Sequence, residues 1–69
     1  MAGLVKRSFS LAGHRTSVAL EPEFWEALAG IAGAGGRTLA ALVAEIDAAR
    51  GNVGNLASAL RVHALSVRR

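Results

Sequence analysis

Polar and apolar side chains alternate along residues 14–20, HRTSVAL, and this alternation is the clearest structural signal in the chain. A period of two predicts a β-strand whose side chains point alternately to two faces. The inner face would carry Thr16, Val18 and Leu20, and the outer face would carry Arg15, Ser17 and Ala19. One face of the strand therefore needs a hydrophobic core, and the other is free to meet a partner.

After this strand, apolar residues recur at helical spacing, and residues that start or stop helices lie between them. Pro22 suits the first position of a helix, where its missing amide hydrogen costs nothing, and the glycine-rich residues 33–36 stop that helix. Thr38 is a suitable N-cap for a second helix, and Asn52 or Asn55 is suitable for a third. The predicted elements are a strand over 14–20 and helices over 22–34, 39–50 and 53–67.

Residues 1–13 permit two interpretations. Residues 5–11 alternate in the same way as the strand, and Ala12-Gly13 would close a hairpin between the two segments. The alternative is a flexible basic arm in front of a domain formed by residues 14–69. In that case the strand over 14–20 pairs with the same strand of a second chain, because everything after it is predicted to be helical.

The size of the chain also favours a second copy. A core built from 69 residues supplies little net stability, and the chain has no cysteine that would form a disulfide. Trp25 is expected to be a packing anchor near a dimer interface. Apolar residues cover more than one face of the predicted third helix: Leu56, Leu60, Ala64 and Val67, with Val62 and Leu65 beside them. Such breadth predicts burial between subunits.

Charge is distributed unevenly along the chain. The net charge is +3, with +3 in residues 1–20, −4 in residues 21–49 and +4 in residues 50–69. A cationic strand region suits an anionic partner such as nucleic acid. The alternative is that basic ends only keep the protein soluble.

Several function classes lack support in the sequence. No metal site is expected, because the two histidines are far apart and no thiolate is present. No cofactor and no catalytic residue are predicted, since Ser17 has no base at a suitable spacing and Glu45 and Asp47 point to different faces of a helix. No apolar stretch approaches the roughly 20 residues of a membrane span. We therefore expect a soluble cytoplasmic protein that is not an enzyme and has no membrane partner.

The ordered combination of these elements resembles the ribbon-helix-helix family. The resemblance lies in HRTSVALEPEFWEALAGIAGAGGRTLAALVAEI, and ALVAEIDAARGNVGNLASALRV is similar to short bacterial members with an extra C-terminal helix. It implies a mostly helical fold with one short strand in each chain. It also implies an intertwined homodimer in which the two strands form an antiparallel β-ribbon between the subunits.

The same resemblance implies a transcriptional regulator that inserts its β-ribbon into the major groove of double-stranded DNA. The outward parity of the strand then makes Arg15, Ser17 and Ala19 the residues that contact bases. Phosphate contacts are expected at the start of the second helix and on the basic arm, from Arg37, Thr38, Leu39, Lys6 and Arg7.

A dimeric protein-interaction module is the alternative function. The ribbon-helix-helix fold is used by antitoxins as well as by repressors, so the fold alone does not decide between them. In this interpretation the third helix or the basic arm binds another protein, and specificity for DNA is weak.

Overall fold

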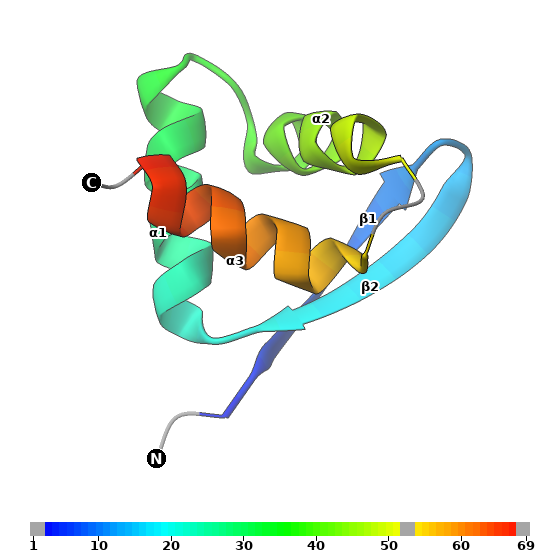
Figure 1. The fold of residues 1–69 in the computed structure, drawn as a ribbon, viewed down its shortest axis with the longest axis horizontal. Coiled ribbons are helices and arrows are strands. Elements are labelled where there is room, and N and C mark those ends of the chain that lie inside the picture. The colour runs from blue at the N-terminus through cyan, green and yellow to red at the C-terminus, as the bar shows by residue number, and fades with distance from the viewer. Residues whose placement is uncertain (1–2, 52–53, 68–69) are drawn as a thin grey trace.

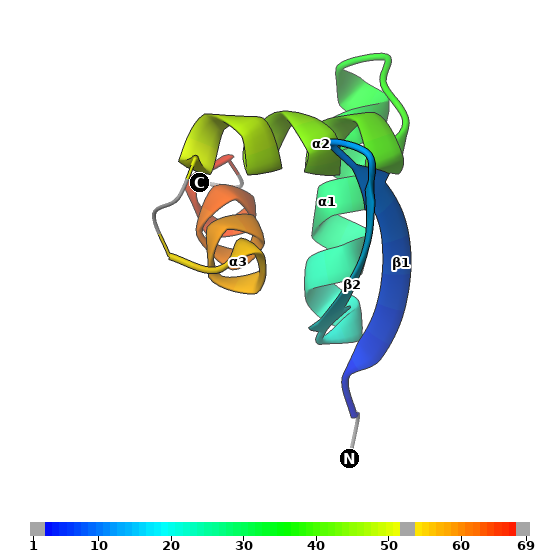
Figure 2. The same cartoon turned by 90° about the vertical axis from the view of Figure 1, so that its right-hand side faces the viewer.

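The computed structural model describes residues 3–51 and 54–67. Two strands are followed by three helices: β1 (Val5–Leu11), β2 (His14–Leu20), α1 (Pro22–Ala34), α2 (Leu39–Arg50) and α3 (Leu56–Val67) (Figure 1). The three helices lie on one side of the strands (Figure 2). The bounds of β2, α1 and α2 coincide with those predicted from the sequence.

Residues 5–11 form a strand, so the chain has two strands instead of the one that the family resemblance implied, and β2 finds a partner within the same chain. β1 and β2 form a two-stranded antiparallel sheet in which Leu11 lies opposite His14 and Val5 opposite Leu20. The two residues between the strands, Ala12 and Gly13, both have positive φ, 51° and 83°, as a type I′ turn requires. This turn matches the twist of the strands, although alanine fits its first position less well than asparagine.

The inner face of the hairpin is buried against the helices, with the parity expected for β2. Val18 and Leu20 of β2 and Phe9 and Leu11 of β1 belong to one continuous core. The helices contribute the remaining buried residues: Trp25, Ala27, Leu28, Ala32, Leu42, Val43, Ile46, Leu56, Leu60 and Ala64. One chain therefore encloses a core from all five elements.

Trp25 is the packing anchor that its position predicted, and it joins α1 to β1. Its side chain is 3% exposed, and its indole Nε1 donates a hydrogen bond of 2.8 Å to the carbonyl oxygen of Val5. The ring of Phe9 lies 5.8 Å from the indole ring, centroid to centroid. This indole fixes the start of β1 on the helical layer, because a buried N–H group needs a partner.

α2 begins at the predicted cap. The backbone of Thr38 is extended, and its hydroxyl oxygen accepts a hydrogen bond of 3.0 Å from the amide of Ala41. This bond satisfies one of the amides that a helix leaves free in its first turn. Thr38 thereby sets the residue at which α2 begins after the glycine-rich turn.

Replacing this cap should lower stability without changing the fold. We expect Thr38→Ala to reduce the free energy of unfolding by about 1 kcal/mol, the usual value of an N-cap hydroxyl. Urea denaturation followed by circular dichroism measures this loss. Thr38→Ser keeps the hydroxyl and should retain most of the stability; an equal loss in both variants would contradict a capping role.

α3 starts later than predicted. The predicted first residue, 53, and the alternative cap, Asn52, lie outside the described residues. Gly54 has a φ of 66°, which a right-handed helix does not allow, and Asn55 caps the helix by accepting a 2.7 Å hydrogen bond from the amide of Ser58. The helix therefore begins at Leu56.

One side of α3 is buried and another is exposed. Leu56, Leu60 and Ala64 pack in the core, whereas Val67, which was expected on the same face, is 51% exposed. The Arg61 guanidinium of α3 donates a hydrogen bond of 3.1 Å to the carboxylate of Glu21, which lies between β2 and α1. This ion pair ties α3 to the junction of β2 and α1.

The Glu21–Arg61 pair predicts a pH dependence of stability. A hydrogen bond from its own backbone amide, followed by the bond from Arg61, lowers the pKa of the Glu21 carboxyl from its ordinary value of 4.5. A lowered pKa in the folded state contributes stability above the pKa of the unfolded chain, and the contribution is lost as the pH falls through the folded value. We therefore expect Glu21→Gln to be less stable than the wild type near pH 7 and to approach it at pH 3.

Urea denaturation at several pH values measures this difference. Glu26→Gln removes an exposed carboxylate from α1, the helix that follows Glu21, outside the ion pair, and serves as the control. A difference between wild type and Glu21→Gln that stays constant down to pH 3 would contradict the role of the ion pair.

Candidate nucleic-acid interface

The hairpin presents a polar face on the side away from the helices. We call this the outer face; it consists of Lys6, Ser8 and Ser10 from β1 and Arg15, Ser17 and Ala19 from β2. The register places them in three cross-strand pairs: Lys6 with Ala19, Ser8 with Ser17, and Ser10 with Arg15. The outer face therefore carries two cations, three hydroxyls and no carboxylate.

The outer face is exposed but firmly positioned. All its side chains are exposed except the half-buried Ala19, and the middle of the face alternates with buried inner residues, among them Phe9 and Val18. The hydroxyl oxygens of Ser8 and Ser17 lie 3.1 Å apart in a hydrogen bond at the centre of the face. Because the inner face is packed, the spacing of the outer groups is set before any ligand arrives.

Lys6 and Arg7 were predicted together as arm contacts, and the structure separates them. Lys6 belongs to the outer face, whereas Arg7 has the parity of Phe9 on the inner side. The Arg7 guanidinium carbon lies 5.5 Å from the centroid of the Trp25 ring, at a distance suited to a cation–π contact. Arg7 also lines a depression with Pro22 and Trp25 of α1 and with Leu39 of α2, so it lies on the inner side of the hairpin instead of the outer face.

The three residues predicted at the start of α2 have different surroundings. Thr38 is exposed and caps the helix, while the half-buried side chain of Leu39 packs against the core, which leaves its backbone amide as its polar group. The guanidinium of Arg37 forms an ion pair with the carboxylate of Glu45, farther along α2. Arg37 is therefore turned along the helix toward α3.

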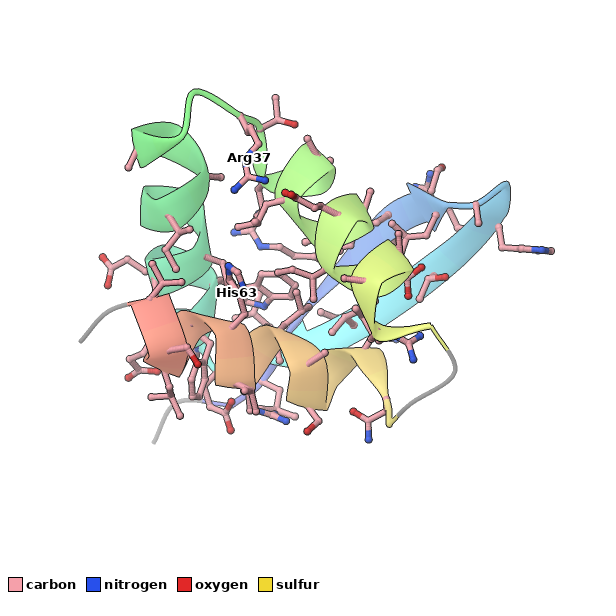
Figure 3. All side chains as sticks on the ribbon, turned by 45° about the horizontal axis from the view of Figure 1, so that its top comes forward. Arg37 and His63 are labelled. Atoms are coloured by element: carbon pink, nitrogen blue, oxygen red, sulfur yellow. The ribbon has the colours of Figure 1, made fainter. Side chains whose placement is uncertain are left out.

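A groove of about 770 Å³ lies between α2 and α3. Its apolar part is formed by Ile46, Ala49, Ala59 and Val62. Figure 3 shows Arg37, from the loop before α2, and His63, from α3, extending toward the same opening. No group of three or more potential metal-ligating side chains lies together among residues 3–51 and 54–67.

The helices were also compared with membrane spans. Within the described part of the chain, no single helix is both long enough and apolar enough to cross a membrane. α1 and α2 meet the criteria of length and composition only when taken together, and they are bent by 98° relative to each other.

Sequence reasoning missed two parts of this surface. Ser8 and Ser10 share the outer face with Arg15 and Ser17, and the alternation along residues 5–11 was the signal for them. The groove between α2 and α3 had no comparable signal, because its walls come from helices whose mutual placement depends on the whole fold.

Comparison with known proteins gives one family. The model of the ribbon-helix-helix domain family matches residues 4–67, which include both strands and all three helices. No curated protein and no solved structure matches the chain.

Proposed function

Because the chain belongs to the ribbon-helix-helix domain family, we propose that it is a dimeric DNA-binding regulator of transcription that acts in the cytoplasm of a bacterial cell. Domains of this family generally form dimers that bind DNA, and they are typically non-enzymatic regulators. In this proposal the hairpin enters the major groove of double-stranded DNA with its outer face toward the bases.

The composition of the outer face is the observation that carries the proposal. A two-stranded ribbon has a strand spacing of about 5 Å and fits a major groove about 12 Å wide. Hydroxyls and guanidinium groups are the side-chain groups that read base edges, and cations are attracted to the phosphates. The outer face also carries no carboxylate that would repel the phosphates.

Each residue of the outer face has a proposed role. Arg15 donates two hydrogen bonds to a guanine, Ser17 bonds to a base edge, and Ala19 lies against a thymine methyl group. From β1, Ser8 and Ser10 add hydroxyls beside Ser17 and Arg15. Lys6, at the end of the face near Ala19, contacts a phosphate, where it contributes affinity without sequence preference.

The start of α2 is the proposed second phosphate contact. The backbone amides at Thr38 and Leu39 and the helix dipole favour an anion there. Arg7 lines the same depression as Leu39, whereas the guanidinium of Arg37 would first have to break its ion pair with Glu45. These contacts would orient the domain on the DNA backbone while the hairpin reads the bases.

A salt-dependent titration tests the proposal. Fluorescence anisotropy would follow binding of the full chain to random duplexes and to a genomic fragment from upstream of its own gene. We expect affinity that falls steeply as salt rises, because phosphate contacts release counterions, and that is higher for the upstream fragment. Lys6→Ala should reduce the slope of log affinity against log salt concentration by about one, because it removes the contact of one lysine with one phosphate. Absence of binding at low salt would overturn the proposal.

A dimeric protein-interaction module is the second candidate. The observation that favours it is the exposure of Val62, Leu65 and Val67 on α3, since exposed apolar side chains gathered on one element often mark an interface. In that case the protein would retain its dimer and show no preference among duplexes in the same titration.

A further inference from the structure

We infer that a hollow between α1 and α3 binds a partner protein, through a segment of that protein that carries both apolar and cationic side chains. We call this hollow the α1–α3 site. It is lined by Glu23, Phe24, Glu26 and Ala27 of α1 and by Ala64 and Leu65 of α3. The inference goes beyond DNA binding and does not depend on it.

The apolar part of the α1–α3 site is suited to a side chain from outside. The hollow has a volume of about 370 Å³, and it contains the small side chains of Ala27 and Ala64, which are 8% and 1% exposed. Phe24 is half-buried and packs against the core, whereas Leu65 is 62% exposed. An apolar side chain that fills the hollow and covers this leucine removes both from water, which is favourable.

The charge of the α1–α3 site indicates which side chains a partner brings. Glu23 and Glu26 are exposed and lie three residues apart on one side of α1. Neither forms an ion pair with another side chain in the described part of the chain, and Arg61 of α3 is paired with Glu21 instead. The site is therefore negative in a protein with a net charge of +3, so it attracts lysine or arginine side chains and repels nucleic acid.

The exposure of the lining residues favours a partner protein over a small molecule. A small-molecule site buries most of the surface of its ligand. Here both carboxylates and Leu65 are exposed, so a small molecule would remain largely in water. A protein segment instead places one apolar side chain in the hollow and covers the rest with its own surface, as amphipathic segments do in apolar grooves.

The position of the α1–α3 site leaves the hairpin free. α3 crosses α1 and contacts it (Figure 1), and the three helices lie on the inner side of β1 and β2 (Figure 2). The outer face of the hairpin points the other way. A partner protein at the α1–α3 site therefore does not cover the surface that we propose for DNA.

A labelled synthetic peptide tests the site on the full chain. The probe is an amphipathic helical peptide with leucines on one side and lysines on the other, and its matched peptide has glutamates in place of the lysines. Fluorescence anisotropy measures binding, and two-dimensional ¹H–¹⁵N spectra locate it. We expect the lysine peptide to bind, more weakly as salt rises, with the largest shifts at the start of α1 and in the second half of α3. The glutamate peptide should not bind.

Paired variants separate the site from its surroundings. Glu23→Gln combined with Glu26→Gln should weaken binding by about 5- to 20-fold, since an exposed ion pair contributes up to about fivefold. Glu45→Gln removes an exposed carboxylate from α2, outside the site, and should have little effect. Leu65→Ser should weaken binding by about tenfold. Val62→Ser removes an exposed apolar side chain of α3 that does not line the site, and it is the matched control.

Circular dichroism checks that each variant is folded. Absence of binding at low salt, equal binding of the glutamate peptide, shifts confined to the α2 side of α3, or equal losses in the site variants and their controls would overturn the inference. DNA titrations keep the two proposals apart. A chain that binds the peptide but no duplex contradicts only the function, and a chain that binds a duplex but no peptide contradicts only the α1–α3 site.

Discussion

Arg15→Ala should weaken DNA binding strongly while leaving the fold intact. The Arg15 side chain is exposed on the outer face, opposite Ser10, and contributes nothing to the core. A bidentate contact of arginine with guanine is worth about 1–3 kcal/mol, so we expect a loss of affinity of about 5- to 150-fold for each such contact. Anisotropy titration at fixed salt measures this loss, and thermal denaturation checks stability.

Arg15→Lys is the informative control for this prediction. It keeps the positive charge but cannot form the planar pair of hydrogen bonds, so we expect it to recover nonspecific binding without recovering the preference among sequences. Full recovery of that preference by lysine would show that Arg15 acts as a point charge near the phosphates. Unfolding of Arg15→Ala would show that the assignment of faces in β2 is wrong.

Val18→Asp should abolish folding. Val18 is 5% exposed and packs in the core between the hairpin and the helices. An unpaired carboxylate buried there costs several kcal/mol, and a domain of this size has only about 3–10 kcal/mol of stability in total. We expect the circular dichroism spectrum of an unfolded chain at room temperature and neutral pH.

Ser17→Asp is the matched control for Val18→Asp. It places the same side chain on the neighbouring residue, which is exposed on the outer face. We expect this variant to fold and to lose DNA affinity, because a carboxylate on the outer face repels phosphate. If both aspartate variants were folded, β2 would lack a buried face and the inward packing of the hairpin would be wrong.

The sequence was sufficient for the parts of the fold that local chemistry determines. Alternation in β2 predicted which side chains face the core, and Val18 and Leu20 are buried as expected. Pro22 and Thr38 predicted the starts of α1 and α2 because each has a conformational or hydrogen-bonding preference for that position. Side-chain parity therefore predicted the β2 half of the outer face.

The remaining features depend on contacts between distant segments. Arg7 has the residue type of a phosphate contact, but its place over Trp25 follows from the packing of β1 against α1. Arg37 pairs with Glu45, which helical periodicity alone did not indicate, because Arg37 precedes the helix. Gly54 sets the start of α3 through a positive φ, and a periodic apolar pattern does not reveal such a break.

The central claim is that the outer face of the hairpin contacts DNA, and an NMR titration tests it most directly. Two-dimensional ¹H–¹⁵N spectra of the labelled protein would be recorded with increasing amounts of a duplex that binds in the anisotropy assay. We predict the largest shifts at the amides of β1 and β2 and at the start of α2, with small shifts on the exposed side of α3. Shifts concentrated on α3, with an unchanged hairpin, would contradict the account.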